Sequence, residues 1–366
     1  MIPKAMKAVL LTGHGGLETL VYREDVPVPA PAAGEVLIEV SACGMNNTDI
    51  WVRQGAYGTD SDPGAVASWR RSGEGGNTTL SFPRIQGTDI VGRIVAVGAG
   101  VPASRIGERV MVDFSLYNRA DDSLVDIDYI GHGRDGGYAE YAAVPAENAW
   151  NVRMAMSDAE LATFCCAYLT GEHMLDRAGV KAGERVLVTG ASGGVGSGLI
   201  QLCRARGAVP YAVAGKGKEA RAKAIGAEAV ITRGAGDLPA AVARATGGAP
   251  IDVVADVVAG PLFNDLLNIL RPEGRYTTAG AIGGPLVQLD LRTVYLKHLQ
   301  IHGSSQGTRA AFRRLVGYIE AGKIKPLLDR TYPLSRLREA QEHFMAKGYF
   351  GKLVVQPDAK WTQVGW

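Results

Sequence analysis

Residues 185–198 read Arg-Val-Leu-Val-Thr-Gly-Ala-Ser-Gly-Gly-Val-Gly-Ser-Gly, an apolar strand that runs directly into a glycine-rich turn and then a helix. We expect Gly193 and Gly194 to provide backbone conformations and a close approach that a Cβ would block. Gly196 would let the helix pack on the strand, with its first N–H groups directed at phosphate groups. The stretch therefore predicts the pyrophosphate site of a dinucleotide.

Short apolar runs follow this turn, and helix-like segments separate them. The runs span residues 209–214, 229–232, 251–256 and 275–279. Pro261 is placed to open a helix over residues 262–270, and Gly274 is placed to close it. Strands that alternate with helices in this way predict an α/β fold with a doubly wound parallel sheet.

The segments on either side of this unit read differently. Residues 6–151 contain short runs of alternating apolar and polar side chains, which predict an all-β region of strands and turns. Ser157 and Glu160 form a capping box that starts the first helical stretch. The expected domains are a mainly-β domain from residues 1–152 and 306–366 and a dinucleotide-binding domain from residues 153–305.

Composition points to a globular chain without a charged or membrane partner. The 366 residues are 46% apolar, and 39 basic and 37 acidic side chains are interspersed to a net charge of +2, so nucleic acid has no basic stripe to bind. No run reaches the roughly 18 apolar residues of a membrane span, and the run after Lys4 and Lys7 is too short for a secretory signal. The 4 cysteines show no disulfide or metal spacing, so we expect a cytoplasmic protein.

Two segments, residues 58–81 and 115–135, read as loops inserted between strands. The first carries Trp69, Arg70 and Arg71, which would either clamp an anionic substrate or lie in solvent. The second carries a group of aspartates that predicts a solvated surface rather than a calcium site, because it lacks the spacing and the terminal glutamate of a calcium loop. These aspartates are Asp121, Asp122, Asp126 and Asp128.

The end of the second strand of the dinucleotide unit distinguishes the two nicotinamide cofactors. An NAD site places an acidic residue there, about twenty residues after the glycine turn, to bind the ribose hydroxyls. This chain instead has Ala-Gly-Lys-Gly-Lys at residues 214–218. Lys216 and Lys218, beside Gly215, suit the 2′-phosphate of NADP, although two lysines in a loop are also typical of a solvated surface.

Several segments, in this order, resemble the medium-chain dehydrogenase/reductase superfamily over essentially the whole length. They are Ala-Cys-Gly-Met-Asn-Asn-Thr-Asp at 42–49, Gln-Gly-Thr-Asp-Ile-Val-Gly-Arg-Ile-Val-Ala-Val-Gly at 86–98, Gly-Tyr-Ala-Glu-Tyr at 137–141, Ala-Ser-Gly-Gly-Val-Gly at 191–196, Gly-Ser-Ser-Gln-Gly-Thr at 303–308 and Gly-Lys-Leu-Val-Val at 351–355. The resemblance implies a GroES-like domain built from both chain ends, a Rossmann domain between them and an active site in the cleft. It also implies a homodimer joined through the strand at residues 299–302.

The chain departs from the zinc alcohol dehydrogenases of this superfamily at the metal. The resemblance places their two cysteines and one histidine at Asn46, Thr88 and Cys166, so that a single thiol remains. Amide and hydroxyl oxygens replace thiolate and imidazole poorly on zinc, which takes three protein ligands at a catalytic site. Residues 115–135 also lack the cysteines of the structural zinc lobe. We therefore expect no metal.

Without zinc, the chain resembles the quinone oxidoreductases and enoyl reductases of the superfamily, in which Asn-x-x-Asp precedes a glycine and a tyrosine. The resemblance makes Tyr57 a proton donor, although a tyrosine that only packs against substrate fits the same position. Asn46 would donate to a substrate oxygen, and Asp49 would order the neighbouring backbone. Thr48 takes the place of a proton-relay hydroxyl and belongs to the candidate catalytic residues, and a structural role is the alternative when zinc is absent.

The resemblance also assigns the cofactor contacts, with Thr170 on the nicotinamide side. The full set is Thr170, Ser192, Gly193, Gly194, Val195, Gly196, Gly215, Lys216, Lys218, Gly280, Ala281, Ile282, Ser304 and Lys352. The 6 histidines have no ligand spacing and read as ordinary surface or core residues.

These features predict an NADPH-dependent, zinc-independent oxidoreductase that transfers hydride to an activated C=C bond or a quinone, because the residues offer no Lewis-acid site. The expected partner is a small-molecule substrate. Two alternatives stay open. One is an alcohol dehydrogenase or carbonyl reductase with an unusual metal site, and the other is a nucleotide-binding structural protein without catalysis.

Overall fold

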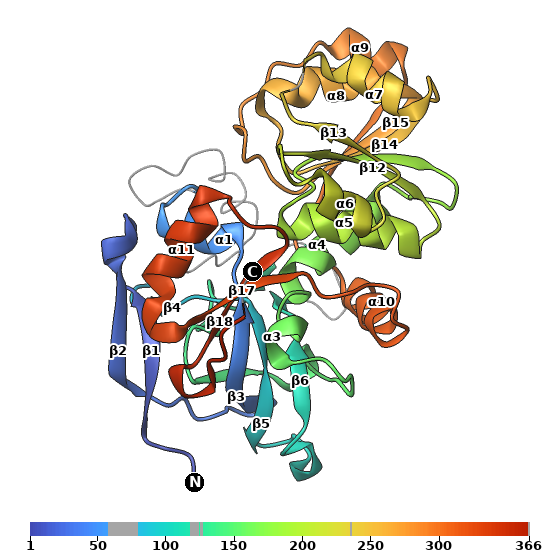
Figure 1. Ribbon diagram of the computed structural model, residues 1–366. Coiled ribbons are helices and arrows are strands. Elements are labelled where there is room, and N and C mark those ends of the chain that lie inside the picture. The colour runs from blue at the N-terminus through green and yellow to red at the C-terminus, as the bar shows by residue number, and fades with distance from the viewer. Residues whose placement is uncertain (58–79, 118–123, 125–126, 235, 365–366) are drawn as a thin grey trace. The chain divides into compact units, whose positions relative to one another are not determined.

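The computed structural model describes residues 1–57, 80–117, 124, 127–234 and 236–364. The chain forms two compact units (Figure 1). Unit 1 comprises Met1–Cys166 and Leu328–Trp366, and unit 2 comprises Ala167–Leu327. None of the helices in the described residues has the length and apolar character needed to cross a membrane.

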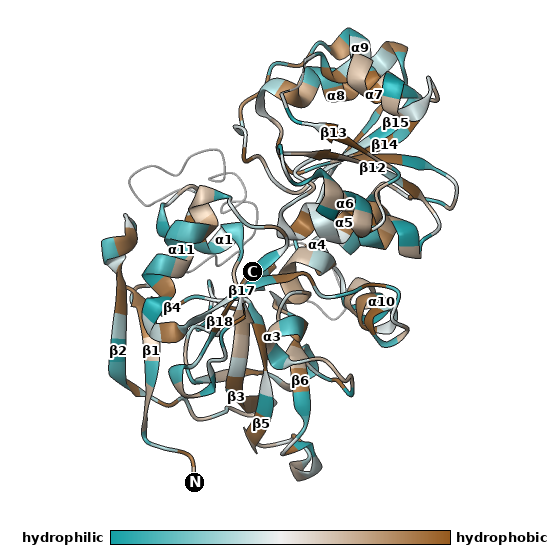
Figure 2. Ribbon diagram, viewed as in Figure 1, coloured by the Kyte–Doolittle hydropathy of each residue, from teal (hydrophilic) through white to brown (hydrophobic). Residues whose placement is uncertain are grey.

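Unit 1 is built on a mainly antiparallel seven-stranded sheet, in the order β10-β6-β5-β3-β18-β17 with β9 paired to β3. Its strands are β3 (Glu35–Gly44), β5 (Asp89–Val97), β6 (Arg109–Val112), β9 (Tyr141–Pro145), β10 (Ala149–Asn151), β17 (Leu328–Pro333) and β18 (Lys352–Gln356). Apolar side chains run along β3 and β5 (Figure 2), where Val36, Ile38 and Val40 are fully buried. Because β18 pairs with β3, both ends of the chain build this sheet, as expected for a GroES-like domain.

Smaller elements complete unit 1. They are a three-stranded sheet of β1 (Ala5–Leu11), β2 (Leu20–Pro27) and β4 (Arg84–Ile85), a hairpin of β7 (Ser115–Leu116) and β8 (Asp128–Tyr129), and the helices α1 (Asn47–Arg53), α3 (Asp158–Leu161) and α11 (Leu337–Ala346). Two sequence expectations are therefore wrong. Residues 47–53 form a helix within the region expected to be all-β, because Asn46 and Asp49 pair across its first turn. The segment expected to be a loop at 115–135 is partly a hairpin.

Unit 2 contains a six-stranded parallel sheet in the order β13-β12-β11-β14-β15-β16, which is the strand order of a dinucleotide-binding doubly wound fold. Its strands are β11 (Arg185–Val188), β12 (Val209–Ala214), β13 (Ala229–Thr232), β14 (Ile251–Asp256), β15 (Leu270–Thr278) and β16 (Gln300–Gly303). Its helices are α5 (Gly194–Ala205), α6 (Glu219–Ala224), α7 (Leu238–Thr246), α8 (Phe263–Ile269), α9 (Leu291–Leu296) and α10 (Arg309–Glu320), and α4 (Cys165–Arg177) begins at the unit boundary. The fold class predicted from the sequence is confirmed.

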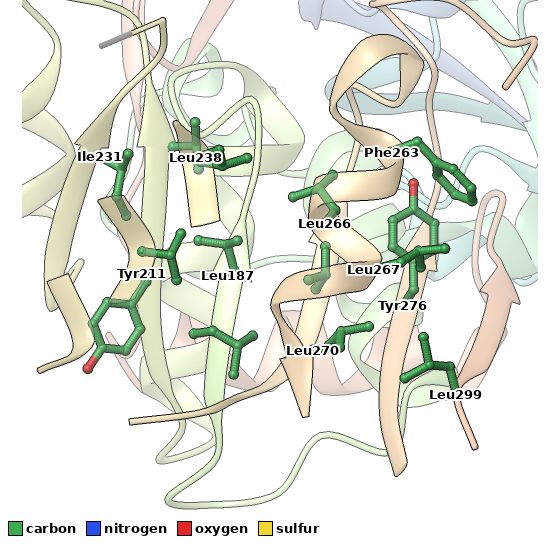
Figure 3. Packing of buried hydrophobic residues seen from close by; sticks show 14 residues of the cluster. Leu187, Tyr211, Ile231, Leu238, Phe263, Leu266, Leu267, Leu270, Tyr276 and Leu299 are labelled. Carbon is green, nitrogen blue, oxygen red and sulfur yellow. The ribbon is translucent and has the colours of Figure 1, made fainter. Parts of the chain in front are cut away.

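The core of unit 2 lies between this sheet and helices α7 and α8 (Figure 3). Tyr276 of β15 packs edge-on against Phe263 of α8, with ring centroids 5.3 Å apart. The sequence placed the end of this helix too late, since α8 ends at Ile269 and Gly274 lies inside β15. The pairing of β15 with β14 shifts register between Leu270 and Arg275, so Gly274 marks an irregularity within a strand.

The two units divide after Cys166 and after Leu327, whereas the sequence placed these divisions after residues 152 and 305. Helix α3 starts at the Ser157 capping box and packs on β3 and β5 of unit 1. Helix α10 packs within unit 2, where Arg314 donates to Glu172 at 3.0 Å. The packing of these two helices, which composition does not reveal, sets the boundaries. All 4 cysteines are free thiols, in agreement with the absence of a disulfide pattern.

Candidate active site

The residues predicted to line the substrate site lie in and around helix α1 of unit 1: Thr48 and Asp49 belong to it, Asn46 is its N-cap and Tyr57 follows it. The backbone N–H of Asn46 donates to Asp49 Oδ2 at 2.8 Å, and the Tyr138 hydroxyl donates to the same oxygen at 2.7 Å. Burial raises the pKa of Asp49 to about 6, although these two hydrogen bonds act in the opposite direction. Asp49 makes the backbone contact expected of an ordering residue. Sequence reasoning did not include Tyr138, which comes from the Gly-Tyr-Ala-Glu-Tyr segment.

Two of the three positions to which the resemblance assigns zinc ligands, Asn46 and Thr88, are hydrogen-bonded to each other. Asn46 Nδ2 donates to Thr88 Oγ1 at 2.9 Å, and Asn46 Oδ1 accepts from Lys352 Nζ at 2.6 Å. The Thr88 hydroxyl donates in turn to Asp89 Oδ1 at 3.0 Å. The Asn46 amide, expected to donate to a substrate oxygen, is thus engaged inside the protein.

The lysine bonded to this amide belongs to a buried ion pair. Lys352 Nζ is 2.8 Å from Asp89 Oδ2, and the two side chains are 2% and 0% exposed. Asp89 Oδ1 also accepts from the backbone N–H of Cys166 at 2.8 Å. Because a buried charge is stable only when it is paired, each partner requires the other. Lys352, which the resemblance assigned to the cofactor, has its ammonium group committed to Asp89 and Asn46.

These residues do not fit a zinc ion. The Asn46 oxygen already accepts from an ammonium ion, and Thr88 offers a hydroxyl that is bonded on both sides. Of the three aligned positions, only Cys166 offers a soft ligand. Among the residues that the structure describes, no group of three or more His, Cys, Asp or Glu side chains is placed to hold a metal ion.

Three hydroxyl groups gather beside α1. Thr48 Oγ1 lies 2.8 Å from the Tyr129 hydroxyl. Burial raises the pKa of Tyr57 to about 12, and the neighbouring Thr48 side chain acts in the opposite direction. Burial also raises the pKa of Tyr129 well above its usual value, so both phenols keep their protons at neutral pH. The Tyr57 ring packs edge-on against Trp51, with centroids 5.7 Å apart.

Tyr129 belongs to the aspartate-rich segment and has no sequence signal that marks it. Its ring stacks on His132 at 4.9 Å and meets Phe114 edge-on at 6.2 Å. His132 Nδ1 lies 2.9 Å from Asp128 Oδ1. The prediction that Asp128 lies on a solvated surface is therefore wrong, because its carboxylate is paired with a buried histidine. The other acidic positions and the loop arginines lie outside the described residues, namely Asp121, Asp122, Asp126, Trp69, Arg70 and Arg71.

The glycine turn of unit 2 has the shape of a phosphate cradle. Gly190, two residues after the end of β11, has a φ of +57° that favours glycine. A Cβ on Gly196 would lie 2.2 Å from the Gly190 carbonyl oxygen, which confirms the predicted close packing. Gly193 differs from the prediction, because its φ is −85° and a Cβ there would meet no protein atom closer than 3.6 Å. The open space beside Gly193, at the start of α5, fits an approaching phosphate group.

The end of β12 carries one more cation than the sequence predicted. Lys216 is exposed and Lys218 is half-buried. A Cβ on Gly215 would lie 4.0 Å from Arg233 Nη2. Arg233 directly follows β13, the parallel neighbour of β12, so adjacency in the sheet could have revealed it. The nearby carboxylate, Glu219, is the first residue of α6 and accepts from the Thr232 hydroxyl at 2.9 Å.

The remaining residues predicted to bind the cofactor lie in unit 2. Thr170 is a buried residue of α4, and the Ser304 backbone N–H donates to the Thr278 carbonyl at 2.8 Å. Gly280, Ala281 and Ile282 follow the carboxyl end of β15, as Ser192, Gly193, Gly194, Val195 and Gly196 follow that of β11. Since parallel strands end at one edge of the sheet, these segments gather where doubly wound folds bind nucleotides.

Comparisons with known proteins agree with this organisation. Residues 32–154 match the alcohol dehydrogenase GroES-like domain, and residues 194–321 match the zinc-binding dehydrogenase family. A crystal structure of a putative alcohol dehydrogenase from Sinorhizobium meliloti 1021 is 74% identical, with a TM-score of 0.93 and 98% of each chain covered. Quinone oxidoreductase of Rattus norvegicus is 28% identical over 362 residues, which cover 96% of this chain and 98% of that protein. A 2-octenoyl-CoA carboxylase reductase, solved with NADP and 2-octenoyl-CoA, is 25% identical with a TM-score of 0.85 and covers 100% of this chain and 90% of its own.

Proposed function

Because the chain belongs to the medium-chain dehydrogenase/reductase superfamily of oxidoreductases, we propose that it is an NADPH-dependent reductase that acts without zinc on an activated C=C bond or a quinone. The observation that carries this proposal is the Lys352 ammonium ion, which is paired with Asp89 and bonded at 2.6 Å to Asn46, one of the three residues to which the resemblance assigns zinc-ligand positions. Without a Lewis acid to polarise a simple alcohol or ketone, the acceptor has to be electron-poor on its own.

The hydroxyl cluster supplies the second half of such a reduction. A bound nicotinamide in its reduced form supplies a hydride. When the acceptor takes up that hydride, negative charge develops on its oxygen and one proton is needed to complete the product. Tyr57 retains its proton at neutral pH and its ring packs against Trp51 of α1, so it is the proposed acid. The balance is NADPH plus one proton plus acceptor, giving NADP⁺ and the two-electron-reduced product.

The choice of NADPH is supported by the cations at the end of β12. Lys216, Lys218 and Arg233 offer partners for a 2′-phosphate, whereas Glu219 accepts a hydrogen bond from Thr232. Charge-assisted hydrogen bonds to phosphate contribute roughly 1.5–3 kcal/mol each, so two of them favour NADPH by at least about tenfold.

We expect the purified protein to oxidise NADPH with enones, enoyl thioesters or quinones, with a lower kcat/KM for NADH and no stoichiometric zinc by elemental analysis. Replacing Lys216, Lys218 and Arg233 with alanine should lower kcat/KM for NADPH at least about tenfold and leave that for NADH unchanged. Lys223→Ala is the matched control, because this lysine of α6 is bonded to the Glu228 carbonyl. Equal use of both cofactors would contradict the choice of NADPH, and one equivalent of zinc needed for activity would contradict the zinc-free mechanism.

An alcohol dehydrogenase or carbonyl reductase is the second candidate function. It is favoured by the 74% identical relative, which is described as a putative alcohol dehydrogenase. The same hydroxyl cluster would then give its proton to a carbonyl oxygen. Product analysis with one α,β-unsaturated ketone separates the two functions, because a C=C reductase forms the saturated ketone and a carbonyl reductase forms the allylic alcohol.

We also propose that the protein is a homodimer joined through β16, the edge strand of the unit 2 sheet. Exposed apolar side chains gather on and just before this strand. They are Leu291, Tyr295, Leu296 and Ile301, with exposures of 66%, 59%, 69% and 43%. An edge strand with exposed apolar neighbours favours association with a second copy.

The variant Leu296→Glu/Ile301→Lys should be a monomer by light scattering, because it places charges on the proposed interface. Ile106→Glu is the control, since Ile106 is 51% exposed but belongs to unit 1. A wild-type monomer, or a variant that remains dimeric, would refute this interface.

A further inference from the structure

Asp256 is a buried carboxylate at the carboxyl end of β14 that the function proposed so far does not use. Its side chain is 0% exposed, and the donors that surround it are neutral. Oδ1 accepts from the Thr189 hydroxyl and, at 2.8 Å, from the Val258 N–H. Oδ2 accepts from the Tyr276 hydroxyl and, at 2.9 Å, from the Ala259 N–H. Because a buried charge is stable only when its hydrogen bonds are made, the carboxylate depends on these donors and fixes them in place.

The turn after β14, residues 257–260, has a strained backbone. Ala259 has a φ of +53° and a ψ of −137°, a conformation that glycine adopts readily and alanine does not. Strain of this kind persists only where the surrounding structure enforces it. The Asp256 carboxylate does so, because it accepts from the N–H groups of Val258 and Ala259. The start of the turn is held by a hydrogen bond from its first N–H group, that of Val257, to Thr189 Oγ1 at 3.1 Å.

This turn lies between the two segments of unit 2 that were predicted to bind the cofactor. On the side of β11, a Cβ on Gly190 would lie 2.8 Å from Val257 Cγ2, and Gly190 leads into the glycine turn. On the side of β15, the Val258 carbonyl oxygen accepts at 2.7 Å from the N–H of Gly283, which directly follows residues 280–282. Both segments belong to the edge of the sheet where doubly wound folds bind nucleotides. A change in the turn therefore displaces both.

We propose that Asp256 is a positioning residue of the cofactor site, which holds turn 257–260 in its strained conformation and thereby sets the spacing between the glycine turn and residues 280–282. The inference rests on the proposed function, which assigns a nicotinamide dinucleotide to this edge of unit 2. Because the carboxylate acts on backbone segments and not on the 2′-phosphate, its effect should be the same for NADPH and NADH. The cations at the end of β12 differ in this respect, since they distinguish the two cofactors.

The substitution Asp256→Asn keeps the shape of the side chain and removes half of its acceptors. Each carboxylate oxygen accepts from one hydroxyl and one backbone N–H, and an amide NH₂ group accepts from neither. A hydroxyl can rotate and accept from the NH₂ group, but a backbone N–H cannot. Either orientation of the amide therefore leaves Val258 or Ala259 without its acceptor. The further substitution Ala259→Gly removes the strain itself, so the turn keeps its conformation with less support.

The test is the dissociation constant of NADPH and of NADH, each measured by titration calorimetry in the absence of an acceptor. Asp256→Asn should weaken both cofactors by about tenfold, because a buried N–H that loses a charged acceptor costs this much or more. Asp256→Asn/Ala259→Gly should recover about threefold of that loss, since glycine adopts the turn conformation without strain. Thr189→Val should also weaken both cofactors, and Thr189→Ser, which keeps both hydrogen bonds of the hydroxyl, should bind them as the wild type does.

Tyr276→Phe is the matched control, because it removes a hydrogen bond from the same carboxylate and leaves both backbone N–H groups bonded. It should leave both dissociation constants nearly unchanged. If Tyr276→Phe weakens binding as much as Asp256→Asn, or if Ala259→Gly restores nothing, the inference fails while the proposed function stands. A wild-type protein that binds NADPH and reduces no acceptor would contradict the proposed reaction alone, and one that binds neither cofactor would overturn both. If Asp256→Asn does not fold, the Thr189→Val and Thr189→Ser pair decides the question.

Discussion

Replacing Tyr57 with phenylalanine is expected to lower kcat with an enone by a factor of ~10²–10⁴, the usual range for loss of a general acid. The substitution removes the phenolic proton and keeps the ring that packs against Trp51 at 5.7 Å. The KM for NADPH should hardly change, because the proposed cofactor contacts, apart from Lys352, belong to unit 2. Steady-state kinetics with varied NADPH and varied enone separate the two effects.

A second measurement reports how far proton transfer limits turnover. In the Tyr57→Phe variant proton transfer has to occur without the positioned phenol and becomes slower, so the solvent deuterium isotope effect on kcat should increase. Tyr22→Phe provides a control, because burial also raises the pKa of Tyr22 to about 12 but its hydroxyl bonds to Glu24. An unchanged kcat for Tyr57→Phe would reduce Tyr57 to a packing residue and leave solvent as the proton donor.

The fold of unit 2 could be predicted from the sequence because its signals are local. The apolar runs at 209–214, 229–232 and 251–256 coincide with β12, β13 and β14. Parallel strands buried on both faces appear as continuous apolar runs, and helices separate them at regular intervals. The error at Gly274 arose because a glycine that makes a strand irregular looks the same in sequence as one that ends a helix.

Helix α1 was missed for a related reason. It has only 7 residues, so its apolar side chains Ile50 and Val52 complete no recognisable helical period. The Asn-x-x-Asp spacing is a capping signal, but it was interpreted only as a functional motif. One segment can serve both purposes, and here the pairing of Asn46 with Asp49 positions Thr48.

Most contacts that define the site could not be predicted from the sequence, because they join residues that are distant in the chain. Lys352 and Asp89 are 263 positions apart, and Thr48 and Tyr129 are 81 positions apart. Lys352 was assigned to the cofactor from its sequence motif alone. A motif does not show which side chains Lys352 contacts in the folded protein. Tyr129 lies in a stretch whose composition predicts solvent exposure. Phe114 and His132 contact its ring only because the β7–β8 hairpin brings them together, and the sequence does not predict that hairpin.

The buried ion pair gives the largest expected effect on stability. Lys352→Met should lower the free energy of unfolding by about 3–5 kcal/mol, because it leaves the fully buried Asp89 carboxylate without its cation. The hydrogen bonds from Thr88 and Cys166 to Asp89 remain, but they compensate a full negative charge only in part. Thermal and denaturant unfolding of the purified variant measure the change. Lys360→Met is the control, since its partner Glu39 is 3.3 Å away and both side chains are about one-third exposed, so the change should be within ~1 kcal/mol.

A double replacement distinguishes the ion pair from simple packing at Lys352. In Lys352→Met/Asp89→Asn both charges are gone, so the double variant should be less destabilised than Lys352→Met alone, although it carries one more substitution. If the side chain of Lys352 served only to fill space, Asp89→Asn would instead add its own cost. The same double variant also changes the proposed active site, because the Asn46 oxygen no longer accepts a hydrogen bond from the Lys352 ammonium ion. A double variant as unstable as the sum of its parts would show that the pair does not neutralise this site, and it would remove the main support for a mechanism without zinc.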